Sequence, residues 1–464
     1  MYKRYVFTGV VYKVKKNVDL LHGNILSALT ELAIPIMATS LVQTAYSLTD
    51  MAWIGMAGSD AVAAVGAAAM YNWLSTGVVT LARMGGQVKA AHAYGEGSRE
   101  EAVRYGRGAL QLTIALALGF GFLTAVFAGP LIGFFRLNSV RVMEEAMVYL
   151  RISCGLILFS FLGQTLTGLY TASGNSRTPF IANCVGMGAN MLLDPLLILG
   201  PGPLPALGVA GAAIATVVSQ LIVSLVLILG VKQDPVLRQQ IRVWNPTPLS
   251  NIRIIVRIGF PAAVQSTLYC GISMVLTRFV TTWGDAAVAV QRLGGQVESI
   301  SWMTADGFGS AINAFTGQNY GAGDMKRVKK GYLMASGVMF VWGMIITLLL
   351  VFGAAPIFSL FIREPDVIPM GEGYLRIIGY SEMFMCIELM TVGAMSGMGK
   401  TMEASVITIA LTSARIPLAL FLGNTFLGLD GVWWALTISS ISKGILFFFA
   451  FLWMMNKADR GKLQ

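Results

Sequence analysis

The sequence predicts an all-α protein that crosses a lipid bilayer many times. Of its 464 residues, 55% are hydrophobic and only 12% are charged, whereas a soluble globular chain carries about twice that charged share. Apolar runs of about 18 residues or more recur along the whole length. The alternating segments of about ten residues that mark an outer-membrane barrel do not recur. The predicted fold class is therefore a polytopic helical membrane protein.

Twelve transmembrane helices can be placed along the chain. Several exceed the roughly 20 residues that cross a bilayer, so we expect tilt or extension beyond it. Most connections are short, but a charged, proline-rich segment near the middle of the chain reads as a linker. The expected spans are 25–55, 61–88, 103–130, 143–172, 179–200, 207–231, 250–281, 287–317, 329–355, 369–396, 402–427 and 431–455.

An internal repeat divides these spans into two halves. Pro35 corresponds to Pro261 at a shift of 226 residues, and the YGEG of 94–97 corresponds to the YGAG of 320–323 at the same shift. Two six-helix lobes repeated in the same orientation are expected to surround a central cavity that opens alternately to each side, so transport is the default function. The expected divisions are a basic arm 1–24, a first lobe 25–231, a linker 232–250, a second lobe 251–455 and a tail 456–464.

The formal net charge of +10 is distributed as the positive-inside rule requires. Loops between the basic clusters are nearly free of Lys and Arg, so both termini are expected in the cytoplasm, and no nucleic-acid partner is indicated. The four cysteines have no paired spacing and there are only two histidines, so neither a disulfide framework nor a His-rich metal site is indicated, and no cofactor is expected. The clusters are Lys3–Lys16, Lys89–Arg107, Lys232–Arg257, Lys326–Lys330 and Lys457–Lys462.

Polar residues in the first lobe form the leading candidate site. Tyr46 and Asp50 lie four residues apart on one face of the first span, and Asn190 and Asp194 are spaced the same way in the fifth. Thr216 follows in the sixth span. Intramembrane acids usually face a bundle interior or a cavity, and two neighbouring carboxylates suit proton coupling. The alternative is that both aspartates lie at helix ends in the interfacial region.

Pro35 removes a helix hydrogen bond and marks an expected bend in the first span. The acid pair is not duplicated in the second lobe, because Leu276 stands at the position that matches Asp50. Glu298 and Glu388 lie deep in apolar sequence and could attract substrate, bind a proton, or pair with Arg278 or Arg292. The candidate cavity residues are Gln43, Glu298, Glu388, Asp306, Met191 and Met303, the methionines because flexible thioethers suit varied ligands.

Taken together, four stretches resemble the multidrug and toxic compound extrusion (MATE) family over nearly the whole chain, from Ile25 to about Met455. They are P…SLTDMAWIG at 35–55, ANMLLDP…LGVAGAAIATVVSQ at 189–220, GFGSAINAFTGQNYGAGD at 307–324 and SGMGKT at 396–401. The resemblance implies two pseudo-symmetric six-helix lobes in a V shape, and export of organic compounds in exchange for H⁺ or Na⁺.

The family's first-lobe cation site has an Asp and a Tyr on helix 1, an Asn-x-x-x-Asp on helix 5 and a Thr on helix 6. The matching positions look like Asp50, Tyr46, Asn190 with Asp194, and Thr216. Pro35 resembles the proline at which helix 1 bends on protonation. NorM-like members also carry a second-lobe Na⁺ site with a Glu on helix 7, where this chain has Tyr269, and an Asp on helix 10, near Met385. The pattern therefore resembles the DinF-like branch, for which H⁺ is the expected coupling ion and Na⁺ the alternative.

The expected function is secondary active efflux of amphipathic cationic or neutral organic compounds by alternating access. The rival functions are a lipid-linked oligosaccharide flippase and a dedicated exporter of one metabolite. An enzyme is not expected, because no span contains a His and no GxSxG element occurs. We expect a monomer in the cytoplasmic membrane of a bacterium or archaeon, with small organic molecules and membrane lipids as its partners.

Overall fold

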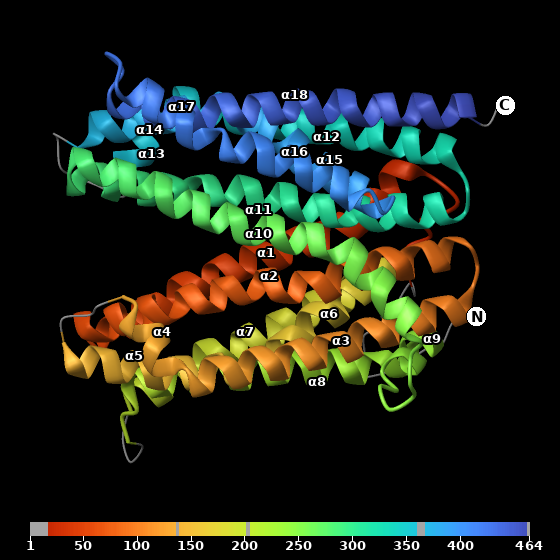
Figure 1. Cartoon of the computed structure of the whole chain (residues 1–464), viewed down its shortest axis with the longest axis horizontal. Coiled ribbons are helices and arrows are strands. Elements are labelled where there is room, and N and C mark those ends of the chain that lie inside the picture. The colour runs from red at the N-terminus through yellow and green to blue at the C-terminus, as the bar shows by residue number, and fades with distance from the viewer. Residues whose placement is uncertain (1–16, 136–138, 201–204, 360–366, 462–464) are drawn as a thin grey trace, which may run out of the picture.

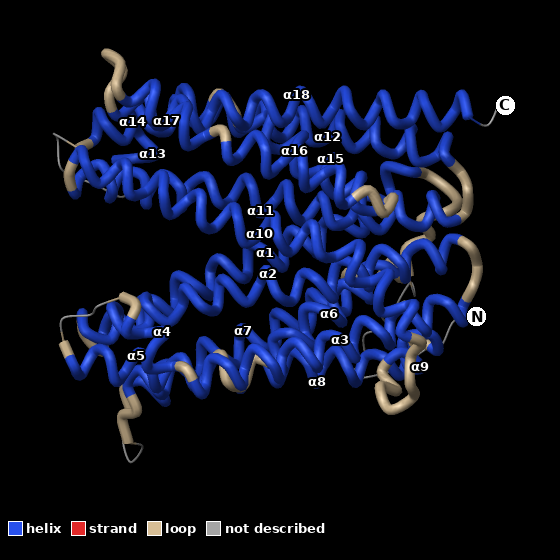
Figure 2. The backbone as a smooth tube through the Cα atoms, in the orientation of Figure 1, coloured by secondary structure: helices blue, strands red, loops and turns tan. Residues whose placement is uncertain are grey.

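The computed structural model describes residues 17–135, 139–200, 205–359 and 367–461. Within these ranges the regular structure is helical (Figures 1 and 2). Most of the basic arm lies outside the described residues. The first bundle contains α1 (Ile25–Met56), α2 (Ser59–Gly95), α3 (Arg99–Val126), α4 (Ala128–Gly133), α5 (Val140–Ser153), α6 (Leu158–Ala172), α7 (Arg177–Ile198) and α8 (Gly208–Gly230).

A 3₁₀ turn (Val231–Gln233) and the short helix α9 (Pro235–Gln240) lead to the second bundle. Gln240 Nε2 donates to the Ala102 carbonyl oxygen at 2.8 Å, so this connecting segment packs on the first bundle. The second bundle contains α10 (Leu249–Val280), a 3₁₀ turn (Thr281–Trp283), α11 (Asp285–Gly321), α12 (Met325–Phe352), α13 (Ala354–Ser359), α14 (Ile368–Gly379), α15 (Glu382–Gly397), α16 (Thr401–Ser413), α17 (Arg415–Gly423) and α18 (Leu429–Gly461).

The helices repeat with the offset found in the sequence. α2 and α11 both have 37 residues, and α3 and α12 both have 28. Gly58 and Gly284, which precede α2 and α11, both adopt the positive φ that glycine tolerates best. Ser98 and Asp324 cap α3 and α12 by accepting a backbone N–H bond three residues on. The same local chemistry therefore starts equivalent helices in both halves.

In the described part of the chain, nine helices are long and apolar enough to cross a membrane. The count reaches eleven if α5 with α6, and α14 with α15, are each one span bent by 46° and 47°. The expected twelve spans are not confirmed by length and composition. α11, which matches α2 in the repeat, is long enough to cross a membrane but is not apolar enough to be counted among the nine. Two expected spans, 143–172 and 369–396, are thus broken helices.

The two bundles meet at one end of the molecule and diverge toward the other, where α4, α5, α13 and α14 lie (Figure 1). We call these the joined end and the diverging end. At the joined end, His92 Nε2 donates to the Gly397 carbonyl oxygen at 2.7 Å, and Gln318 Nε2 donates to the Ala172 carbonyl oxygen at 2.7 Å. Both bonds join residues of different bundles.

The first helix of each half packs partly into the other bundle. Leu29 and Leu32 of α1 are buried in the core that contains Phe315 of α11 and Phe447 of α18. In the opposite direction, Ile255 of α10 is buried against α3. The remainder of α1 contacts α7, so this helix belongs to one bundle at its start and to the other at its end.

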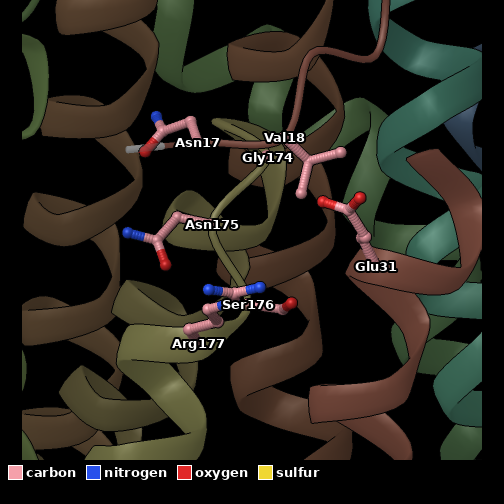
Figure 3. Close-up of a pocket in the computed structure, with 7 residues that line it drawn as sticks. All are labelled: Asn17, Val18, Glu31, Gly174, Asn175, Ser176 and Arg177. Carbon is pink, nitrogen blue, oxygen red and sulfur yellow. The ribbon is translucent and has the colours of Figure 1, made fainter. Parts of the chain in front are cut away.

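A strap formed by residues 17–23 precedes α1 at the joined end. Val18 N donates to the Gly174 carbonyl oxygen of the first bundle at 3.0 Å. Arg327 of the second bundle donates to the carbonyl oxygens of Leu20, His22 and Gly23. Figure 3 shows Asn17 and Val18 beside Gly174, in a small pocket that Glu31 and Arg177 also line. The strap therefore contacts both bundles.

Candidate functional site

The candidate site lies where α1 passes α7 in the diverging half of the first bundle. Asp50 is six residues before Met56, the last residue of α1, and Asp194 precedes the internal Pro195 of α7. Asn190 and Asp194 are both 0% exposed, and Asp50 is half-buried. The packing of α1 on α7 brings the two aspartates together, and neither lies at an exposed helix end.

The carboxyl groups of Asp50 and Asp194 face each other within hydrogen-bonding range. Two ionised carboxylates have no proton to donate. Within the described residues, Asp50 Oδ1, both carboxylate oxygens of Asp194 and the side-chain amide of Asn190 have no hydrogen-bond partner. Buried polar atoms are normally satisfied, so these unpartnered oxygens mark the pair as a candidate site for a proton or a cation.

Tyr46, Thr216 and Tyr149 form the wall around this pair. The Tyr46 phenol lies beside the Thr216 hydroxyl and interacts electrostatically with both aspartates. Thr216 Oγ1 donates to the Ala212 carbonyl oxygen within α8 at 3.0 Å. Tyr149 of α5 reaches the same place and was missed from the sequence, because a lone Tyr in an amphipathic helix carries no distinguishing signal.

Comparison with known proteins identifies the family to which this chain belongs. The MatE family model matches residues 35–196 and 261–421, two segments whose starts are separated by the repeat offset of 226. The chain belongs to the MatE family. The family resemblance inferred from the sequence is thereby confirmed. MATE proteins are transporters rather than enzymes, and this chain is a multi-pass membrane member of that family.

Relatives and solved structures match over almost the full length. A probable multidrug resistance protein NorM of Thermotoga maritima is 28% identical over 440 residues, 92% of each chain. An FAD transporter of Shewanella oneidensis is 26% identical over 438 residues, 93% of this chain and 95% of its own. A crystal structure of a MATE protein in the straight conformation is 25% identical, with a TM-score of 0.87 over 97% of this chain and 100% of that one.

The other candidate residues of this MATE chain are more dispersed. α1 runs through Pro35 without a break, and Thr39 Oγ1 donates to the Pro35 carbonyl oxygen at 2.8 Å. Gln43 is exposed on the same helix, and Met191 is half-buried on α7. The predicted bend at Pro35 and the predicted cavity role of Gln43 and Met191 remain predictions.

Two predicted cavity residues on α11 face the first bundle. Met303 Sδ accepts a hydrogen bond from Thr44 Oγ1 of α1 at 3.0 Å. Asp306 is exposed, and its carboxylate interacts with the Arg83 guanidinium of α2. These contacts place Met303 and Asp306 at the meeting of the two bundles.

Glu388 instead lies inside the second bundle. It forms a 2.7 Å ion pair with Lys443 of α18, and neither Arg278 nor Arg292, the partners suggested by the sequence, takes that place. Glu298 and Arg415 lie near Lys443, and Glu382 lies near Glu298. Glu382, Arg415 and Lys443 were missed, although an ionisable residue within an apolar span is itself a signal of function.

Proposed function

We propose that this MATE chain is a secondary active exporter that exchanges amphipathic cationic or neutral organic compounds for H⁺. The observation that supports the proposal is the Asp50–Asp194 carboxyl pair, in which Asp50 Oδ1 and both oxygens of Asp194 have no donor in the described residues. A proton shared between them supplies the missing hydrogen bond and removes the repulsion of two like charges. Names such as multidrug resistance protein and multidrug export protein among the relatives support the substrate class.

The pattern of acids favours H⁺ over Na⁺ and a DinF-like branch. The Tyr46 and Thr216 oxygens already face each other, and the carboxyl groups are close enough to share one proton. The NorM-type second-lobe acid on helix 7 is replaced by Tyr269. Na⁺ at the same carboxylates is the alternative that the experiment below separates.

The shape of the molecule supports alternating access. We place the joined end in the cytoplasm, because the loops with the basic residues lie there, together with both ends of the described chain (Figure 1). The diverging end then faces outward. Protonation of Asp50 and Asp194 would favour one arrangement of the bundles and substrate the other, so the two ligands are linked through the conformational equilibrium.

The test is efflux of a fluorescent organic cation from proteoliposomes under an imposed pH gradient or an imposed Na⁺ gradient. Wild type is compared with Asp50→Asn, and with Glu403→Gln as a matched control at an exposed acid paired with Lys400. We expect transport with the pH gradient, retained in Glu403→Gln and abolished in Asp50→Asn. A response to the Na⁺ gradient alone would overturn H⁺ coupling, and pH-driven transport in Asp50→Asn would overturn the site.

A dedicated exporter of one metabolite is the second candidate, favoured by the FAD transporter among the relatives. The same liposomes, loaded with FAD in place of the cation, test it directly. Transport of FAD without transport of several unrelated cations would establish this narrower function. An oligosaccharide flippase has no comparable support among these relatives. We further propose that the protein acts as a monomer in the cytoplasmic membrane.

A further inference from the structure

The second bundle encloses a group of ionisable side chains that the Asp50–Asp194 site does not use. They come from six helices of the second bundle, and all but the half-buried Glu298 and the exposed Tyr269 are buried. Their charges must therefore be considered together. The group comprises Glu298 of α11, Glu382, Cys386 and Glu388 of α15, Tyr374 of α14, Tyr269 of α10, Arg415 of α17 and Lys443 of α18.

Three of these charges have partners. Lys443 Nζ and Glu388 Oε1 are 2.7 Å apart, and both side chains are almost completely buried. Arg415, also buried, donates from Nε to Ser439 Oγ at 3.1 Å and from Nη2 to Ser440 Oγ at 2.9 Å. A buried ion pair keeps both partners charged because separating them leaves an uncompensated charge.

Glu382 has no such partner among the described residues. It is 0% exposed, and neither carboxylate oxygen accepts a hydrogen bond. The Ser301 side chain lies beside Glu382 and also contacts Cys386 Sγ at 3.8 Å, a contact in which either group can be the donor. A neutral hydroxyl does not balance the charge of an ionised carboxylate. Glu382 is the first residue of α15, directly after the 47° bend that separates α14 from α15. An ionised carboxylate in this position is costly unless something neutralises it.

A second glutamate, Glu298 of α11, lies close to Glu382, so the two form a candidate proton-binding pair. Ser301 contacts Cys386 and Asn313 contacts Gly393, so α11 and α15 run side by side in the same direction. Glu298 and Glu382 each lie about one turn before the first of these contacts, which places the two glutamates near each other, and both act electrostatically on Tyr374. With all three glutamates ionised, the group carries three negative charges against the two positive charges of Arg415 and Lys443. One bound proton brings the sum to zero. A metal cation would instead meet two fixed positive charges, so the charge balance favours the proton.

The first bundle has no equivalent of this site. Position 298 corresponds to Asn72 at the repeat offset of 226, and Asn72 is neutral and hydrogen-bonded to Ser153 Oγ and Cys154 Sγ. Conversely, Leu276 corresponds to Asp50. Each bundle therefore has an acid pair of its own at a different place. The pair also differs from the NorM pattern, because its carboxylates come from α11 and α15 and have Arg415 and Lys443 beside them.

We propose that Glu298 and Glu382 share one proton and form a second proton-binding site, separate from Asp50 and Asp194. Proton binding at this site stands without the proposed antiport. Its participation in transport rests on that proposed function. If it does participate, the protein exchanges more than one proton for each substrate.

Infrared difference spectra of the purified full-length protein, recorded between alkaline and acidic pH, test the binding. The measured signal is the carbonyl stretch of a protonated buried carboxyl group. We expect Glu382→Gln and Glu298→Gln each to remove the same component of this signal, and Glu382→Asp and the control Glu403→Gln to retain it. Asp50→Asn should remove a different component. Size-exclusion chromatography and thermal unfolding verify that each variant is folded.

A spectrum of folded Glu382→Gln identical to that of wild type would overturn the site. Loss in Glu382→Gln but not in Glu298→Gln would overturn the shared proton. The number of protons exchanged per substrate, measured from the pH gradient at which flux reverses, should fall by one in Glu382→Gln. Failure of pH-driven transport in wild type, with the infrared result intact, would overturn the proposed function and leave the second proton site standing.

Discussion

Gln87 Nε2 donates to Asn313 Oδ1 at 3.1 Å, and these two residues occupy the same position in the two repeats, 226 residues apart. The bond joins α2 to α11 and is buried. A contact between equivalent residues lies on the axis that relates the two halves. Asn313 Nδ2 also donates to the Gly393 carbonyl oxygen at 3.2 Å, which ties α15 to the same point.

Removing this axial bond should weaken the joined end. We expect Gln87→Leu and Asn313→Leu to show a coupling free energy of about 0.6 kcal/mol in a double-mutant cycle, the average for polar contacts in membrane proteins. The measurement is reversible unfolding in detergent of the wild type, the two single variants and the double variant. Strictly additive effects would contradict the coupling.

Glycines at the joined end allow the backbones of the two bundles to touch. A Cβ at Gly95 would overlap the Gln318 carbonyl oxygen, and a Cβ at Gly321 would overlap the His92 carbonyl oxygen. His92 and Gln318 are themselves equivalent at the offset of 226, so the two contacts are reciprocal. We expect Gly95→Ala to force the bundles apart there and to lower the unfolding temperature.

The matched control is Gly66→Ala in the same helix, where a Cβ meets nothing within 4 Å. Labelling of a cysteine introduced at His92 reports whether the joined end has opened. Equal unfolding temperatures and equal labelling in the two alanine variants would show that the close approach is unimportant.

Removing one partner of the Lys443–Glu388 ion pair should destabilise the protein strongly, whereas replacing both partners should destabilise it less. Lys443→Met leaves Glu388 buried without its partner, for which the loss is about 3–5 kcal/mol. Lys443→Met combined with Glu388→Gln removes both charges and should recover much of that loss. The measurement is the unfolding free energy of the wild type and of these two variants. A double variant as unstable as the single one would argue against a simple ion pair.

Arg327 should hold the strap on the second bundle. Its guanidinium donates to three strap carbonyl oxygens, at 3.1 to 3.3 Å. We expect Arg327→Ala to raise the hydrogen-exchange rate of residues 18–23 by at least tenfold. Lys330→Ala, at an exposed position of the same helix, serves as the control. An unchanged exchange rate in Arg327→Ala would show that Arg327 does not hold the strap. The buried side chain of Leu20, which packs in the core of the second bundle, would then be what holds it in place.

The parts of the structure that depend on local spacing could be predicted from the sequence. The offset of 226 was visible in loop motifs because turns require particular residues, as Gly97 and Gly323 show with an identical φ of 74°. Asp50 and Asp194 could be predicted as a pair because each lies one helical turn from another polar residue. The breaks between α5 and α6 and between α14 and α15 were not predicted, since no proline marks them.

Long-range pairings were the parts that sequence could not supply. Glu388 and Lys443 are 55 residues apart on different helices, and the sequence around either residue does not indicate that the other is its partner. Glu382 is noticeable in the sequence as an ionisable residue in an apolar span, but the sequence around it does not show whether it has a partner. Its lack of a partner is a property of the packed bundle, which depends on helices far away in the chain.

The first helix of each repeat, α1 or α10, packs partly into the bundle of the other repeat. This exchange has the geometry of a domain-swapped dimer whose two subunits have been joined into one chain. Cutting the polypeptide between 232 and 250 would separate the repeats in sequence without separating two folding units. A fragment of the second repeat alone would lack Leu20, Leu29 and Leu32, which complete its core. Two fragments made in the same cell should therefore reassemble, whereas either one alone should fail to fold.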